Sequence, residues 1–230
     1  MINNTDGNFK VFGCDTDSII FSKRDGSEIS EQEQQSILDK VNSLFPDKIK
    51  FEDDGYYPSV IVFKAKNYVL FDGKEKKIKG SALKDQKKEP AIKEFQSAII
   101  ESILAGRNDY AEIYYSFVRE AMDVKDMSRW SSKKSLTQKV FSSPRTNEKK
   151  VRDAIEGTDY REGDKVYVYF KSDESLGLVE NFDGEYHKTK LLAKLHQSTK
   201  LFKSVLPTQE IFLNYALKKN KNILENICKL

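Results

Sequence analysis

The chain lacks the residues and runs that several protein classes need. Its 230 residues include 2 Cys and 2 His, which excludes a disulfide framework, a four-cysteine zinc site and a His-rich metal site. No apolar run approaches the roughly 20 residues that span a bilayer. The amino terminus has neither a basic start nor an apolar core, so no signal peptide is expected. We therefore expect a soluble protein of a reducing, intracellular compartment.

An excess of one charge is also missing. There are 39 Lys and Arg against 36 Asp and Glu, a net charge of +3. A strongly basic nucleic-acid arm is thus excluded as a description of the whole chain, and any basic surface must be local. The 14 Phe and 11 Tyr are enough to build a core, so wholesale disorder is not expected.

Apolar periodicity divides the chain into two regions of different character. Up to about residue 82, alternation and turn residues predict strands with one helix. Beyond about residue 90, the helical period dominates. The predicted strands are 9–13, 18–21, 60–63, 68–71, 77–79 and 164–170, and the predicted helices are 30–44, 90–104, 110–122, 148–155, 188–202 and one opened by Pro207. The sequence therefore predicts an α+β protein with antiparallel strands first and helices after.

Two carboxylates lie at the tip of the first predicted hairpin, in Cys14-Asp15-Thr16-Asp17. Carboxylates crowded at a turn repel one another unless a cation lies between them, and Mg²⁺ suits such a site because it also accepts phosphate oxygens. On these residues alone, a solvated turn is the favoured interpretation, because short motifs match often by chance.

With apolar strands on both sides, Asp15-Thr16-Asp17-Ser18 resembles motif C in the palm of the family B DNA polymerases. The common form has Tyr-Gly before the first Asp, whereas this chain has Gly13-Cys14, similar to the variant of protein-primed phage enzymes. The resemblance implies that Asp15 and Asp17 are catalytic metal ligands, with Asp17 bridging two Mg²⁺ ions and Asp15 supporting the site.

Further signals follow motif C at the spacing of the family. Lys66-Asn67-Tyr68 resembles its Lys-x-Tyr motif, and Lys79-Gly80, followed by Lys84, resembles the Lys-Gly pair before the thumb. The resemblance implies that Lys66, Tyr68, Lys79, Gly80 and Lys84 bind the primer–template. An ordinary strand and a solvated loop are the alternatives.

An acidic residue also precedes the Lys-x-Tyr strands in the family and lies near the metals. Glu52 takes that position here and is assigned to the metal site by resemblance, although its register against Asp53 and Asp54 is open. Tyr57-Pro58-Ser59-Val60-Ile61 resembles the end of motif A, but that motif lies upstream of motif C in the family. Tyr56-Tyr57-Pro58 is therefore interpreted as a turn before the next strand.

The distal region resembles the thumb of phage and viral members. The resemblance implies that residues 1–86 are the carboxyl-terminal part of the palm and residues 87–230 the thumb. A thumb grips duplex through phosphates. The candidate contacts are Lys133, Lys134, Arg145, Lys149 and Lys150, and for each a solvated surface charge is the alternative.

The exonuclease domain, motif A and fingers of a complete polymerase are not found in the 14 residues before Asp15. The expected function is therefore the carboxyl-terminal piece of a DNA-directed DNA polymerase that joins a separate chain carrying those parts, in the cytoplasm of a host cell if the source is a phage or virus. Its expected partners are primer–template DNA and deoxynucleoside triphosphates, with no membrane. A palm piece of this kind should expose an unpaired sheet edge. A non-catalytic DNA-binding module, or the relic of a disrupted gene, is the alternative.

Overall fold

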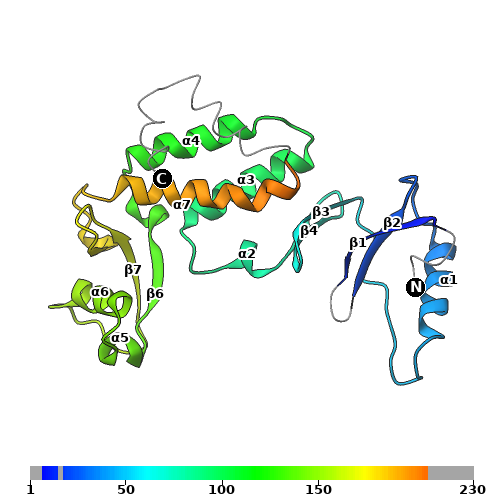
Figure 1. The fold of residues 1–230 in the computed structure, drawn as a ribbon, viewed down its shortest axis with the longest axis horizontal. Helices are drawn as coiled ribbons and strands as arrows, with labels where there is room; N and C mark the ends of the chain where they lie inside the picture. Colours follow the sequence, from blue (N-terminus) through cyan, green and yellow to red (C-terminus); the bar gives the residue numbers. More distant parts are fainter. Residues whose placement is uncertain (1–6, 15–17, 207–230) are drawn as a thin grey trace. The chain divides into compact units, whose positions relative to one another are not determined.

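The computed structural model describes residues 7–14 and 18–206, which form two compact units, Met1–Ser81 and Ala82–Leu230 (Figure 1). The expected α+β class is confirmed. The chain divides after residue 81, five residues before the predicted boundary at residue 86. The assignment of these units to palm and thumb stays a prediction.

The first unit begins with the predicted hairpin. Strands β1 (Phe9–Cys14) and β2 (Ile19–Lys23) pair antiparallel, with Cys14 opposite Ile19 and an irregularity between Val11 and Gly13. Phe9 and Phe21 meet edge to face across the two strands, with ring centroids 5.6 Å apart. The segment 15–17 lies outside the described residues.

Helix α1 (Glu31–Asn42) starts directly after its cap, Ser30, the first residue of the helix predicted over 30–44. The Ser30 hydroxyl accepts from the Glu33 backbone, and the Glu33 carboxylate accepts in return from the Ser30 backbone, which is a capping box. Lys23 adds an ion pair to Glu33 at 2.8 Å. The helix ends at Asn42 rather than at the predicted Leu44, because the chain turns away to form a loop.

A three-stranded antiparallel sheet follows in the order β3-β4-β5, formed by β3 (Ser59–Lys64), β4 (Asn67–Phe71) and β5 (Lys76–Lys79). All three strands were predicted. Asp72 closes the predicted turn between β4 and β5 by accepting from the backbone of Lys74 and Glu75, both at 2.7 Å. Ile61, Phe63 and Val69 are buried in this sheet.

The second unit combines a group of packed helices with a small sheet. Its elements are α2 (Ser81–Lys84, which spans the boundary), α3 (Pro90–Leu104), α4 (Tyr110–Met122), η2 (Met127–Trp130), β6 (Ser132–Ser135), α5 (Gln138–Ser142), α6 (Thr146–Ile155), β7 (Lys165–Phe170), β8 (Leu176–Leu178), η3 (Val179–Asn181), α7 (Lys188–Thr199) and η4 (Lys200–Ser204). The helix predicted from Pro207 onward lies outside the described residues.

The core of this unit has a helical part and a sheet part. In the helical part, the fully buried ring of Phe95 meets Tyr114, Phe117 and Phe202 edge to face, at centroid distances of 5.6–6.2 Å. In the sheet part, the antiparallel order β6-β7-β8 presents an apolar face to α5 and α6. The residues of that second cluster are Leu136, Val140, Val151, Ile155, Val166, Val168 and Leu178.

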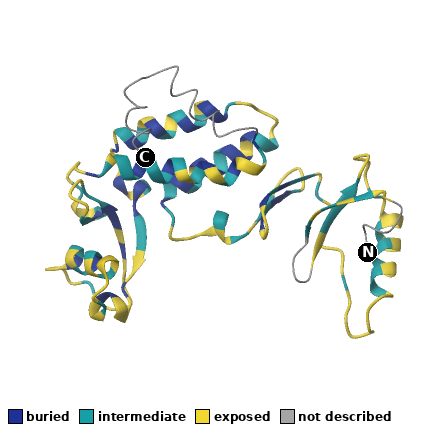
Figure 2. Ribbon diagram, in the orientation of Figure 1, coloured by how far each residue is buried: buried dark blue, intermediate teal, exposed yellow. Residues whose placement is uncertain are grey.

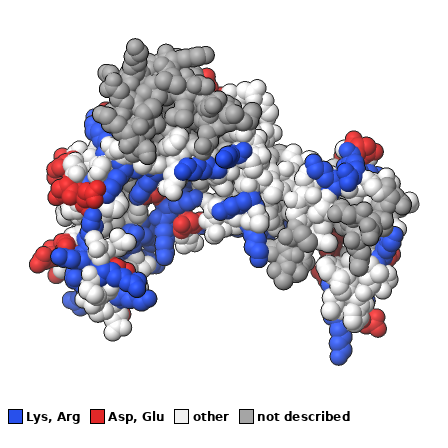
Figure 3. All heavy atoms as spheres, viewed as in Figure 1, with Lys and Arg blue, Asp and Glu red and all other residues white. Residues whose placement is uncertain are grey.

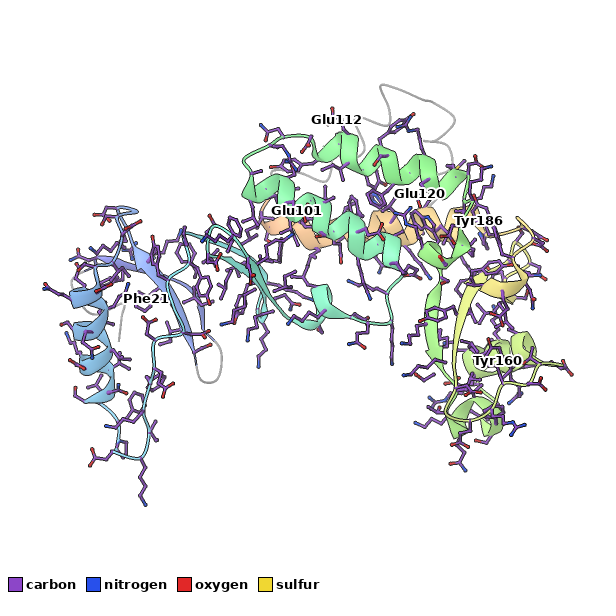
Figure 4. All side chains as sticks on the ribbon, turned by 180° about the vertical axis from the view of Figure 1, so that it is seen from behind. Phe21, Glu101, Glu112, Glu120, Tyr160 and Tyr186 are labelled. Atoms are coloured by element: carbon purple, nitrogen blue, oxygen red, sulfur yellow. The ribbon has the colours of Figure 1, made fainter. Side chains whose placement is uncertain are left out.

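Strand β6 was not predicted, because its sequence Ser-Lys-Lys-Ser carries no apolar alternation. Two buried side chains, Trp130 and Tyr186, hold the segment that leads to β6. Figure 4 labels Tyr186 and Glu120, the partner of Trp130. Trp130 donates its indole N–H to Glu120 at 2.8 Å. The Tyr186 hydroxyl donates to the Ala121 carbonyl at 3.1 Å and accepts from the Val124 N–H at 3.0 Å.

Among the described residues, no helix is long and apolar enough to cross a bilayer.

Candidate nucleic-acid interface

The turn between β3 and β4 carries the first predicted contact, Lys66. Lys64 lies opposite Asn67 after an irregularity in the register, so Ala65 and Lys66 form the turn. Lys66 has φ +61°, a left-handed conformation uncommon for residues with a Cβ. The Asn67 side chain is buried and its amide donates to the Ala65 carbonyl at 2.9 Å. The backbone at Lys66 is therefore held in a defined turn.

Gly80 lies directly against this turn. Its φ is +101°, and a Cβ on it would overlap the Lys66 carbonyl oxygen and the Asn67 side-chain amide. Only glycine permits both this φ and this close approach. The Lys-Gly pair therefore lies next to the Lys-x-Tyr motif, although 12 residues lie between Lys66 and Lys79 in the chain.

Tyr68 and Lys79 form a cross-strand pair between β4 and β5. Directly opposite residues of an antiparallel pair share a face, so the ring of Tyr68 and the ammonium of Lys79 belong to the same side of the sheet. Tyr68 is partly buried and Lys79 is exposed. This side of the sheet therefore carries the rigid, hydroxyl-tipped ring of Tyr68 and the flexible ammonium of Lys79. Such a pair suits contacts with a nucleotide sugar and its phosphate.

The loop before β3 is tied to the same side of the sheet. Lys77, two residues before Lys79 on β5, donates to the Asp54 carboxylate at 2.8 Å and to the Tyr57 hydroxyl at 3.2 Å. The hydrogen bond with Asp54 raises the pKa of Lys77, and the bond with Tyr57 adds to the shift. Residues 56–58 lead into β3 without forming a strand, but they form no hydrogen-bonded turn: only Pro58 lies at a bend, so the predicted turn is not found.

The predicted metal ligands are placed only in part. Asp15 and Asp17 lie outside the described residues, between the paired residues Cys14 and Ile19. Glu52 is an exposed residue of the loop, two positions before the anchored Asp54. Within the described residues, no three His, Cys, Asp or Glu side chains gather as a metal site would require.

The second unit carries the candidate duplex contacts on two elements. Lys133 lies opposite the exposed Tyr167 on the outer side of the sheet, whereas Lys134 is exposed opposite the buried Val166. Arg145 and Lys149 are exposed at the start of α6. Lys150 is half-buried and donates to the Glu174 carbonyl at 2.6 Å.

A basic cluster that sequence reasoning missed surrounds Phe170, the last residue of β7. The ammonium groups of Lys190 and Lys194, from α7, and of Lys150, from α6, lie 4.1, 5.4 and 5.8 Å from its ring centroid. Figure 3 shows Lys and Arg side chains gathered over α7 and the adjoining sheet. The basic character of the 188–203 segment was a signal, but the aromatic ring that collects the charges comes from a distant strand.

Glu89 anchors one member of this cluster. It is only 6% exposed, accepts from the Ser132 hydroxyl at 2.7 Å and forms an ion pair with Lys194. Burial pushes the pKa of Glu89 upward, but the charge of Lys194 and the hydrogen bonds from Lys194 and Ser132 outweigh burial, so its pKa lies below the usual value. The pair joins the start of α3 to α7 and β6.

Comparisons with known proteins bear on the fold. No family model matches the sequence. No curated protein matches it. Among solved structures, the chain is similar to the family B DNA polymerase from the hyperthermophilic archaeon Pyrobaculum calidifontis, with a TM-score of 0.61 and 18% identity over 86% of this chain. The matched part is 27% of that polymerase, so the chain spans about a quarter of the protein it resembles.

At this level of identity the similarity concerns architecture. The strand-rich first unit and the mostly helical second unit follow the expected order. The chain therefore has an α+β fold similar to part of a family B DNA polymerase.

Proposed function

We propose that this chain is the carboxyl-terminal part of a family B DNA polymerase, comprising the later palm and the thumb. The observation that carries the proposal is the convergence of two motifs. Tyr68 pairs with Lys79 across β4 and β5, and Gly80 packs on the Lys66 turn. These are the residues that the resemblance assigns to the primer–template, and the polymerase-like fold supports the same assignment.

In this function, the sheet β3-β4-β5 holds the primer end of a DNA duplex. Lys66 and Lys79 offer positive charges to phosphates, and Tyr68 offers its ring and hydroxyl to the sugar and the minor groove. The closely packed Gly80 holds the backbone of the Lys66 turn against the end of β5, next to Lys79. The second unit holds the duplex already made, through Lys133, Lys134, Arg145, Lys149 and Lys150; Lys84 on α2 belongs to this unit.

The reaction is attack of the primer 3′-hydroxyl on the α-phosphate of a deoxynucleoside triphosphate, with pyrophosphate leaving. Asp15 and Asp17 would hold Mg²⁺, with Glu52 as an additional ligand; carboxylate oxygens are the donors that this ion prefers. When bound, the metal pair supplies electrostatic stabilisation to the attacking and leaving oxygens. The described residues of the chain contribute by binding the primer and orienting its 3′-hydroxyl.

Two or three carboxylates are few ligands for a pair of Mg²⁺ ions. We therefore propose that activity requires a second polypeptide that carries motif A, the fingers and the exonuclease.

The test is Mg²⁺-dependent primer extension by the tagged chain recovered from its native cell, with and without the polypeptides that copurify. We expect extension that needs a second polypeptide, is lost in Asp17→Ala and is retained in the control Asp39→Ala, an exposed carboxylate on α1. DNA binding without extension in the complete complex would favour the non-catalytic DNA-binding module. Extension by this chain alone would contradict the need for a partner.

A further inference from the structure

The amino-terminal part of the first unit is folded but has no interior. Between residues 7 and 60, none of the side chains that the structure describes is buried, although the segment contains a hairpin and a 12-residue helix (Figure 2). A two-stranded hairpin is marginally stable by itself, and helices owe most of their stability to packing. This segment therefore needs a surface that covers it.

Its apolar side chains point to the same need. Monomeric proteins seldom expose large contiguous apolar patches, whereas single exposed apolar side chains are common. The exposed large apolar residues of this unit are Phe12, Ile19, Leu44, Phe45, Ile49 and Tyr56. Three of them, Leu44, Phe45 and Ile49, belong to the loop 43–51, which follows α1.

This loop is held in shape by Asn42, the last residue of α1. The Asn42 side chain accepts from the Phe51 N–H at 2.7 Å and donates to the Phe51 carbonyl at 3.1 Å, which closes the loop at its base. Inside it, the Phe45 and Phe51 rings lie 5.0 Å apart between centroids. The Ile49 N–H donates to the Pro46 carbonyl at 2.8 Å. These contacts hold the loop closed by residues of the chain itself.

The closed loop presents its apolar side chains outward. Leu44 is 52% exposed, Ile49 49% and Phe45 37%. A preorganised apolar protrusion binds with less loss of conformational entropy than a flexible one. Apolar and aromatic side chains grouped on one loop suit the apolar core of a protein–protein interface.

We propose that loop 43–51 is the docking protrusion for the polypeptide that completes the polymerase fold, an inference that rests on the proposed function. The proposed function supplies the occupant, a polypeptide that carries motif A and the fingers, and the loop lies in the segment 7–60, in which no described side chain is buried. A second copy of this chain would bury the same loop, and the experiment separates the two occupants.

The first experiment places a photo-crosslinking phenylalanine analogue at Phe45, or at the control Phe141, which is 40% exposed in the other unit. Crosslinking is done in the native cell, and the products are identified by mass spectrometry. We expect position 45, and not position 141, to capture a polypeptide whose sequence carries a polymerase motif A and fingers. Capture of a second copy of this chain, or no capture at position 45 from cells that yield active complex, would overturn the proposal.

The second experiment compares recovery of that polypeptide by Leu44→Asp/Ile49→Asp, by Asn42→Ala and by the control Phe141→Asp. Because Leu44 and Ile49 are exposed, the double variant should fold, which circular dichroism checks. We expect at least a tenfold loss of recovery for the double variant, a smaller loss for Asn42→Ala, and none for the control. Unchanged recovery with full primer extension would refute the docking loop and leave the proposed function standing. Loop-dependent recovery without extension would support the loop and contradict the proposed function.

Discussion

Replacement of Gly80 by Ala tests the contact that joins the two motifs. The new Cβ meets two obstacles: a φ of +101° and overlap with the Lys66 carbonyl and the Asn67 side chain. Gly73, in the turn between β4 and β5, provides a matched control, because its φ is +98° and no atom lies within 4 Å of a Cβ placed there. The two substitutions share the backbone penalty and differ in the overlap.

The magnitudes follow from these two terms. A residue with a Cβ at such a φ costs about 1–3 kcal/mol, which is the whole effect expected for Gly73→Ala. Overlap in a close-packed site adds about 1–3 kcal/mol. Gly80→Ala should therefore destabilise the first unit by about 1–3 kcal/mol more than Gly73→Ala, a large difference for a small unit whose total stability is marginal.

The assay must report the first unit separately. Trp130, the single Trp of the chain, is buried in the second unit, so its fluorescence monitors that unit and serves as an internal control. Amide hydrogen exchange in β4, at the buried Val69, reports the first unit. Equal loss of protection in the two variants would show that Gly80 does not pack on the Lys66 turn, and the argument for a joined lysine pair would fail.

The remaining predictions concern binding and pH. Lys79→Ala should weaken binding to a primer–template duplex and lower the slope of log K against log salt concentration by about 1. The control Lys74→Ala, in the turn at the other end of the β4–β5 hairpin, should leave binding unchanged. Equal effects of the two variants in filter binding would contradict a local contact at Lys79. Glu89→Gln should lower the free energy of unfolding of the second unit by about 1–3 kcal/mol at pH 7, measured by Trp130 fluorescence in urea. Because Glu89 has a lowered pKa in the folded protein, the wild-type advantage should disappear as the pH falls below 4.5. His196, whose Nδ1 lies 3.3 Å from the Tyr114 hydroxyl, has its pKa lowered by burial and by the charge of Lys200. The unfolded chain therefore takes up this proton first, so stability should fall as the pH drops through 6.5, and His196→Gln should remove that part of the decrease.

Local pattern was sufficient for most elements. The first hairpin, the helix start at Ser30 and the two strands on either side of Asp72 follow from neighbouring residues, and all three are present. Strand β6 could not be predicted, because it is held by pairing with β7 and by Glu89 rather than by any apolar pattern of its own. Helix α1 ended early because Asn42 uses its side chain to close a loop.

The sequence by itself determined which residues are candidates for chemistry, because motif type depends on residue identity and short spacing: an acidic pair at a predicted hairpin tip, a Lys-x-Tyr and a Lys-Gly. Only the tertiary structure decided that Tyr68 faces Lys79, that Gly80 supports the Lys66 turn, and that three lysines surround Phe170. It also decided that loop 43–51 is closed with its apolar residues outside. Contacts between distant segments depend on strand register and packing, which no local pattern encodes.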